Sequence, residues 1–293
     1  MKPDRFCVPL VRVLFALFAA IAVAMPVHAA RVGVLSNKYA TETAADFNVR
    51  IPTHVFTAID TSVAIPTLQS LTNSFDLVLV FEDSTYGNAT AVGDALAAFA
   101  NSGRVVIIGA FYDQDRSDGP AITSPHGWGA LELVDPNTTD KTGTPYAPRT
   151  LDTATMLRHP LTTGITALSS AKFAGGNQAK PGTTVVAYWN QPNAQGRPDP
   201  AIAFRITGAA CVIQLAIAPN YAVIGAAGTD YSGDFHVAWK DAFDFGANRC
   251  ISTSGNSNGS DPQAIPSLSA WGLMLTMLLV GAGAALQRRR RAR

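Results

Sequence analysis

Residues 75–108 read FDLVLVFEDSTYGNATAVGDALAAFANSGRVVII and contain the pattern that decides the fold. The run 75–81 is apolar at all but one position and has the length of a strand buried on both faces of a parallel sheet. Residues 104–108 form a second apolar run of strand length. Two such strands joined by a helix make a βαβ unit, which predicts a parallel sheet.

The stretch between these two strands has the marks of an amphipathic helix. Asn88 or Thr90 can cap its first turn, and Gly103 suits the position just after its last turn. Its apolar side chains recur at helical spacing on one face. They are Val92, Leu96, Phe99 and Ala100.

The flanking segments continue the alternation of strands and helices. Residues 31–36 and 54–59 have the composition of strands, and a weak helix at 41–50 lies between them. Residues 112–158 show little periodicity and predict a long excursion over the carboxyl edge of the sheet. The spacing therefore indicates an α/β fold with a doubly wound, mostly parallel sheet.

The second half of the domain adds three strands and a closing helix. The strands are expected at 183–189, 201–206 and 210–217. An amphipathic helix is then expected to end near Gly246. Its apolar side chains recur at every fourth position: Phe235, Trp239 and Phe243.

With these elements placed, residues 31–248 resemble the class I glutamine amidotransferase-like superfamily, nearest its ThuA-like branch. The resemblance rests on the opening strand, the run 75–82, Gly109 and the final helix, and most recognisably on HPLTTGI at 159–165. It implies a flavodoxin-like fold of three layers, αβα. It also implies a cleft at the carboxyl ends of the strands, where such sheets bind ligands.

The residues that such enzymes use for acyl transfer are replaced in this chain. Active members carry a nucleophilic Cys in a Gly-x-Cys-x-Gly turn and a late His that activates it. Here the turn reads GAFYD at 109–113, with Phe111 in the place of the nucleophile. APN at 218–220 stands where those enzymes carry His and Glu. We therefore expect a catalytically degenerate domain, without catalytic residues, that acts by binding or as a structural part.

The alternative is an enzyme of another chemistry in the same cleft, such as a carbohydrate-active hydrolase. Acids and a histidine near the cleft could act as acid and base. Aromatic rings there could stack on an extracellular polysaccharide, although aromatic residues beside strands usually belong to the core. The candidate cleft residues are Glu82, Phe111, Tyr112, Asp113, Asp115, His126, Trp128 and His159.

The sequence indicates no metal site and no cofactor. Asp113, Asp115 and Asp118 precede a glycine and loosely resemble a calcium loop. Their spacing is not that of an EF-hand, and solvated loop acids are the simpler interpretation. His54 and His236 read as ordinary strand and helix residues, and no two histidines of the domain share metal-ligand spacing.

Residues 1–30 have the parts of a secretory signal peptide. Basic residues precede an apolar run at 13–25, which is followed by PVHAA. Val27 and Ala29 suit the −3 and −1 positions, so cleavage is expected after Ala29, with Ala30 as the alternative. Export then involves the secretion translocon and signal peptidase.

The C-terminal end carries the features of a second targeting signal. Residues 251–263 form a polar linker, and within 264–293 a short signature leads into an uncharged stretch at 268–286 and five arginines. As a helix that stretch reaches about 28 Å, enough to span a bilayer with the arginines in the cytoplasm. The signature residues are Ile265, Pro266, Ser267, Leu268, Trp271 and Gly272.

This order of parts resembles the IPTL-CTERM class of exosortase sorting signals, with Ser267 where that family usually has Thr. The resemblance implies that an exosortase-type membrane protease cuts near the signature; a permanent membrane anchor is the alternative. The protein would cross the inner membrane and stay anchored for a time with its domain in the periplasm. It would then reach the cell surface or the exterior.

The charge of the domain at 31–250 limits its possible partners, and its cysteines predict a disulfide. Eight of the 22 basic residues but only one of the 21 acidic residues lie in the two ends, so the domain and linker carry about six net negative charges. Such a surface argues against binding nucleic acid. Without Cys7, which lies in the signal peptide, Cys211 and Cys250 remain. In an exported chain they predict one disulfide; a buried pair of free thiols is the alternative.

Overall fold

The computed structural model describes six stretches of the chain. The chain divides into two units, Met1–Ser257 and Asn258–Arg293, and the second lies wholly outside the described residues. The expected signal peptide lies outside them as well, apart from its last two residues. The described stretches are residues 29–82, 86–110, 127–136, 148–171, 176–193 and 196–250.

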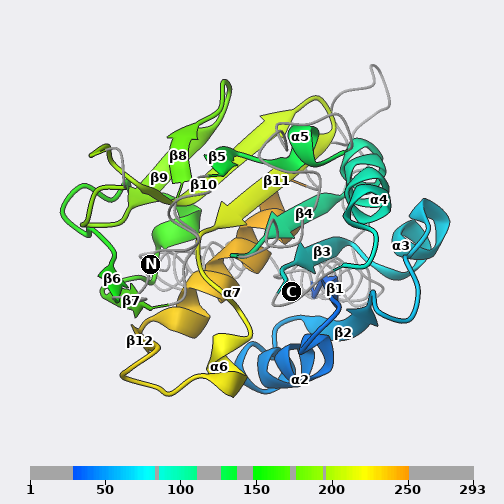
Figure 1. Ribbon diagram of the computed structural model, residues 1–293, viewed down its shortest axis with the longest axis horizontal. Coiled ribbons are helices and arrows are strands. Elements are labelled where there is room, and N and C mark those ends of the chain that lie inside the picture. Colours follow the sequence, from blue (N-terminus) through cyan, green and yellow to red (C-terminus); the bar gives the residue numbers. More distant parts are fainter. Residues whose placement is uncertain are drawn as a thin grey trace, which may run out of the picture. The chain divides into compact units, whose positions relative to one another are not determined.

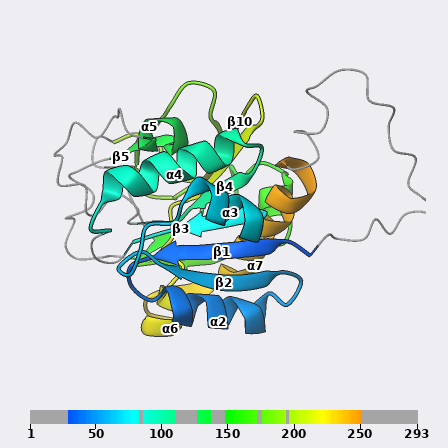
Figure 2. The same cartoon turned by 90° about the vertical axis from the view of Figure 1, so that its right-hand side faces the viewer.

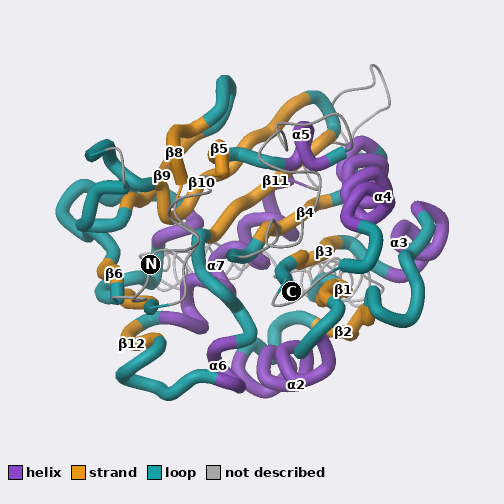
Figure 3. Tube along the Cα trace, viewed as in Figure 1, coloured by secondary structure: helices purple, strands orange, loops and turns teal. Residues whose placement is uncertain are grey.

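A seven-stranded sheet in the order β2-β1-β3-β4-β11-β10-β9 forms the centre of the domain (Figures 1 and 3). The first five strands in this order are parallel, whereas β10 is antiparallel to both of its neighbours. This mostly parallel α/β arrangement fits the expected flavodoxin-like fold. The strands are β1 (Arg31–Ser36), β2 (Val55–Asp60), β3 (Leu77–Val80), β4 (Val105–Ile108), β9 (Thr184–Tyr188), β10 (Pro200–Thr207) and β11 (Ala210–Leu215).

Helices cover both faces of the sheet and form a separate hydrophobic core on each (Figure 2). One face carries α2 and α7, and the other carries α3, α4 and α5. Buried strand residues therefore alternate between the two cores, which is why these strands are apolar throughout. The helices are α2 (Ala40–Arg50), α3 (Leu68–Ser74), α4 (Ala89–Asn101), α5 (Trp128–Leu131) and α7 (Phe235–Phe245).

The βαβ unit matches the sequence expectation closely. Of the two caps considered, Asn88 is the one used: its side chain accepts a hydrogen bond from the N–H of Ala91 at 3.0 Å. Gly103 follows α4 with φ of 85°, a left-handed conformation that glycine adopts without strain. The helix α3 was not expected, because it is short and only Leu71 in it is buried.

Short elements fill the second half of the chain, including part of the stretch expected to be irregular. Two small sheets, β12-β7-β6 and β5-β8, flank the main one. Their strands are β5 (Val134–Pro136), β6 (Arg149–Thr150), β7 (Leu168–Ser170), β8 (Gly176–Ala179) and β12 (Tyr231–Gly233). The remaining elements are the 3-10 turn η1 (Pro160–Thr162), the helix α6 (Tyr221–Ile224) and the π-helix η2 (Gly246–Cys250).

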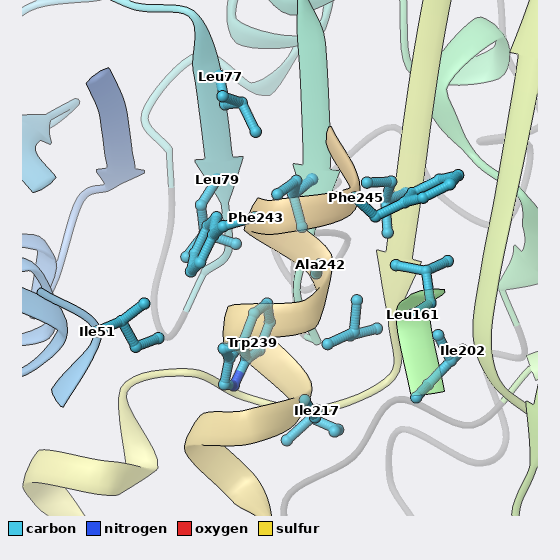
Figure 4. Close-up of a cluster of buried hydrophobic side chains, with 14 of the residues drawn as sticks. Ile51, Leu77, Leu79, Leu161, Ile202, Ile217, Trp239, Ala242, Phe243 and Phe245 are labelled. Atoms are coloured by element: carbon cyan, nitrogen blue, oxygen red, sulfur yellow. The ribbon is translucent and has the colours of Figure 1, made fainter. Parts of the chain in front are cut away.

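The helix α7 closes the fold by packing lengthwise against the sheet (Figure 4). The ring of Phe243 lies 4.9 Å from that of Phe56 and 5.6 Å from that of Phe47. After α7, a Cβ added to Gly246 would lie 2.7 Å from Cδ2 of Leu77, so only glycine lets the backbone approach the sheet this closely. Leu77 begins β3, and the end of α7 therefore lies at the amino edge of the sheet.

Candidate functional site

The direction of winding reverses between β1 and β3, which defines a switch point at the carboxyl edge of the sheet. From β1 the chain adds β2 on one side, and it then returns to add β3 and β4 on the other. Leu35 pairs with Val80, so the residues that follow β1 and β3 leave the sheet side by side. Doubly wound folds bind ligands at this point.

The loop after β1 is held by local hydrogen bonds and contains a strained residue. Ser36 Oγ donates to the carbonyl of Lys38 at 2.9 Å and accepts its N–H at 3.2 Å. Tyr39 has φ of 63°, and among the described residues no other non-glycine has a positive φ. Such a conformation costs about 1–3 kcal/mol and is often found at functional sites. Nζ of Lys38 lies 4.9 Å above the Tyr39 ring.

Buried polar atoms surround this loop. Oδ1 of Asn37 and Oγ1 of Thr61 are both buried, and within the described part of the chain neither has a hydrogen-bond partner. Glu82, which follows β3, is fully buried. Unsatisfied buried acceptors are uncommon in folded proteins, and a bound ligand is one of the groups that can satisfy them. The switch-point site is defined here as Asn37, Lys38, Tyr39, Thr61 and Glu82.

Apolar residues pack together at the adjacent part of the carboxyl edge, beyond the ends of β4 and β11. A Cβ added to Gly109 would lie 3.0 Å from Cδ of Pro219 and 3.1 Å from Cβ of Phe81, so this turn is tightly packed. Ala110 and Ala218 are buried together, with Tyr221 packed against them. Small apolar residues from the ends of β4 and β11 are thus in contact with each other here.

The HPLTTGI segment has a structural explanation. Nδ1 of His159 accepts the N–H of Leu161 at 3.2 Å, and Oγ1 of Thr162 accepts the N–H of His159 at 3.2 Å, which caps the turn η1 at its start. The N–H of Gly164 donates to Oδ2 of Asp241 on α7 at 3.2 Å. A Cβ at Gly164 would lie 2.6 Å from Val237 of the same helix. The segment therefore attaches η1 to α7.

A pocket of about 480 Å³ lies beside this segment. The imidazole of His159 stacks on Phe204 at 4.8 Å and contacts Phe245, near the amino edge of the sheet. His159 is therefore not brought together with Glu82. The lining residues of the pocket are Thr153, Met156, Leu157, Arg158, His159, Pro160, Thr162 and Thr163.

Trp128 lies in the core rather than on an open surface. Its Nε1 donates to the carbonyl of Ala89 at 2.7 Å, and the residue is 3% exposed. A Cβ added to Gly93 of α4 would lie 2.4 Å from the indole ring, so this glycine makes room for it. The ring joins α5 to α4.

The remaining candidate residues lie outside the described part of the chain. These are Phe111, Tyr112, Asp113, Asp115 and His126, together with the tail signature from Ile265 to Gly272. Within the described ranges, no group of three or more His, Cys, Asp or Glu residues is arranged to hold a metal ion. Cys211 is disulfide-bonded. Its pairing with Cys250 stays a prediction, because the side chain of Cys250 lies outside the described residues.

The other two histidines of the described domain each bond an aspartate far away in sequence. Nε2 of His54 lies 3.0 Å from Oδ1 of Asp244, and Nε2 of His236 lies 2.7 Å from Oδ2 of Asp46. The first pair joins α7 to the residue before β2, and the second joins α7 to α2. His236 lies in a helix as expected, whereas His54 lies just before β2, which begins at Val55, and not in the strand.

Two carboxyl groups on α7 have shifted pKa values. Burial raises the pKa of Asp241, and the N–H donated by Gly164 only partly offsets it. Burial alone would also raise the pKa of Asp244, but hydrogen bonds from His54 and Lys240 outweigh it, and the pKa lies below its usual value. Both carboxyl groups belong to contacts that hold α7 in place.

Sequence reasoning missed most of the switch-point site. It named Glu82 but not Asn37, Lys38, Tyr39 or Thr61. The available signal was position: polar residues that directly follow a predicted first strand fall at the carboxyl edge of a doubly wound sheet. The left-handed conformation of Tyr39 had no signal, because Tyr is not a residue that favours it.

Residues 263–291 match the IPTL-CTERM motif, which confirms the predicted tail. The motif points to export and sorting to the cell surface. Its expected membrane span lies outside the described residues; within them, no helix combines the length and apolar content needed to cross a bilayer. Fold and tail together define an α/β protein with a flavodoxin-like sheet and an exosortase-type sorting signal.

Among solved structures, the chain is similar to an exo-β-1,4-mannosidase from Opitutaceae bacterium strain TAV5, with 11% identity and a TM-score of 0.40. It is also similar to a β-galactosidase from Rahnella sp. R3, with 15% identity and a TM-score of 0.40. Each likeness covers 85% of this chain but only 39% and 35% of those chains. The carbohydrate deacetylase Agd3 has 14% identity and a TM-score of 0.36 over 65% of this chain and 30% of its own. No curated protein matches the sequence.

Proposed function

We propose that the protein is exported, cut near its signature by an exosortase-type protease and delivered to the cell surface, where its domain acts by binding. The observation that carries the proposal is the IPTL-CTERM match at 263–291. The domain is exposed to the periplasm while the tail anchors it and is released outward after the cut. Its net negative charge and surface address suit an extracellular polysaccharide or another surface component rather than nucleic acid.

The domain is proposed to be a degenerate relative of the amidotransferase-like proteins. Acyl transfer needs a nucleophile after β4 and a base within hydrogen-bond reach of it. After β11, Ala216 and Ile217 are followed by Ala218, Pro219 and Asn220, and none of these last three side chains can act as such a base. The ring of Pro219 packs closely against Gly109, the residue that begins the turn after β4. These contacts support a domain without acyl-transfer chemistry.

Binding is assigned to the switch-point site. Its buried acceptors and the Lys38 side chain offer polar groups at the edge where such sheets hold ligands. The test is binding of the purified protein to extracellular polysaccharide from its own cells. Asn37→Ala should weaken binding, and Asn73→Ala, an exposed amide on α3, serves as the matched control. Equal binding by both variants would remove the site from the account.

Sorting has its own test. Mass spectrometry of the mature protein from its native cell should find a C-terminus near the signature and no arginine cluster. Arg288 to Arg291 still attached to most of the mature protein would favour the permanent anchor.

A carbohydrate-active hydrolase remains the second candidate, and one observation favours it: the carboxyl group of Glu82 is fully buried at the switch point. A hydrolase using Glu82 as its acid or base would release reducing sugar from the same polysaccharide, and Glu82→Gln would abolish the release. Binding without release of sugar supports the first proposal.

A further inference from the structure

The chain enters the core at Ala30. Ala29 is exposed, whereas Ala30 is fully buried. The carbonyl of Ala30 accepts the N–H of Val55 at 3.0 Å, and its own N–H donates to Nδ1 of His54 at 3.1 Å. A cut after Ala30 would remove a buried residue and both hydrogen bonds. A cut after Ala29 would remove neither.

The acceptor of the Ala30 N–H hydrogen bond is His54, whose ring is held in one tautomer. A backbone N–H can only donate, so Nδ1 of His54 accepts and Nε2 carries the ring proton. Nε2 donates to Oδ1 of Asp244 at 3.0 Å, and the His54 side chain is 0% exposed. Lys240 donates to the same carboxylate. A neutral imidazole thus directs its lone pair at the nitrogen of Ala30, with a carboxylate behind it.

This arrangement suits an ammonium group better than a peptide N–H. After a cut at this bond, the nitrogen of Ala30 becomes an α-amino group, which is mostly an ammonium group at neutral pH. Its hydrogen bond to His54 becomes charge-assisted, roughly twice as strong as a neutral one. The carboxylate of Asp244 behind the ring balances the positive charge, so the buried group is paired.

We propose that signal peptidase cuts between Ala29 and Ala30 and that His54 and Asp244 form a binding site for the α-ammonium group of the mature chain. The proposal requires export and is independent of what the switch-point site binds. Removal of the signal peptide then adds a charged contact between the start of β1 and α7. The mature chain is therefore more stable than one that keeps a residue before Ala30.

The position of the cut is tested on the full chain. The complete protein, with its signal peptide, is expressed in a host that exports it, and the N-terminal peptide of the exported protein is sequenced by mass spectrometry. Ala30 is the expected first residue. A mature chain that begins at Arg31, or at any residue before Ala30, would overturn the proposal.

The binding site is tested through the reactivity of the α-amine. Exported protein is treated at pH 7 with a limiting amount of an amine-acylating reagent, and labelling of the N-terminal peptide is followed over time. Labelling should be about tenfold slower in the folded protein than in urea, because it requires local opening of the site. His54→Gln should lose this protection. Equal labelling rates of wild type and His54→Gln would overturn the site.

His236→Gln is the matched control, because His236, which lies on α7, forms the same kind of pair with Asp46 on α2. It should keep the protection of the amine. If His54→Gln fails to fold, a chain exported with one extra residue before Ala30 replaces it. Its melting temperature should fall by about 2–4 °C, the shift that corresponds to roughly 1 kcal/mol in a domain of this size. An unchanged or higher melting temperature would overturn the proposal.

Discussion

The α7 face and the carboxyl edge of the sheet use polar residues in opposite ways. On the α7 face, His159 caps a turn, His54 and His236 bond aspartates, and each of these side chains joins α7 to another element. At the carboxyl edge, the small residues Ala110 and Ala218 are buried together, and unsatisfied acceptors lie beside the strained Tyr39. The type of a polar residue alone therefore does not predict whether it is structural or functional. Its position relative to the edges of the sheet is the better guide.

The largest expected difference between the two regions is in stability. Phe243→Ala removes a fully buried ring from the α7 core and should lower the free energy of unfolding by about 3–5 kcal/mol. Tyr221→Ala, which removes a half-buried ring at the carboxyl edge, should cost about 1–2 kcal/mol. Urea denaturation compares them, with the exposed Val63→Ala as a neutral control. Equal losses of unfolding free energy in Phe243→Ala and Tyr221→Ala would show that the two regions do not differ in their contribution to stability.

The close contact between the HPLTTGI segment and α7 predicts a steric clash when Gly164 is replaced by a larger residue. Gly164→Ala places a methyl group 2.6 Å from Val237, which should cost about 1–3 kcal/mol. Val237→Ala removes the clashing group, so the double variant should recover much of that loss. A double-mutant cycle measures the coupling. Additive losses would mean that the segment does not meet α7 in this way.

Backbone strain at Tyr39, in the switch-point site, predicts a substitution that raises the free energy of unfolding instead of lowering it. Tyr39→Gly removes the cost of a left-handed conformation and should raise the free energy of unfolding by about 1 kcal/mol. The control is Glu42→Gly in α2, where glycine should lower it by a similar amount. A loss of stability in Tyr39→Gly would show that the ring contributes more by contact than its backbone costs.

The smallest effect is expected at an exposed carboxylate. Backbone N–H groups of Thr166 and Ala167 lower the pKa of Asp234 below its usual value. A lowered pKa in the folded state adds stability above the unfolded pKa of about 3.9, and this is lost as the pH falls further. Unfolding measured between pH 6 and pH 2 should show a smaller decline for Asp234→Asn than for wild type. Identical profiles would count against the contact.

The central sheet could be predicted because its information is local. Residues 31–36 form a strand as expected, and Asn88 and Gly103 bound α4 where the pattern placed them. The contacts that give His54 its role could not be predicted, because Asp244 is distant in sequence and comes close only when α7 packs on the sheet. Most of the switch-point site was missed for a similar reason: the residues that follow β1 and β3 leave the sheet side by side only because β1 pairs with β3.

We propose that the carboxyl edge cannot catalyse acyl transfer, and an assay of glutamine hydrolysis tests this proposal. Mature protein is incubated with glutamine, and released ammonia is followed against an enzyme-free blank. We expect no turnover, and none after Phe111→Cys, because Ala218, Pro219 and Asn220 stand where amidotransferases carry the late histidine, and catalytic groups act as a unit. Sustained glutamine hydrolysis by the wild-type protein would contradict the account.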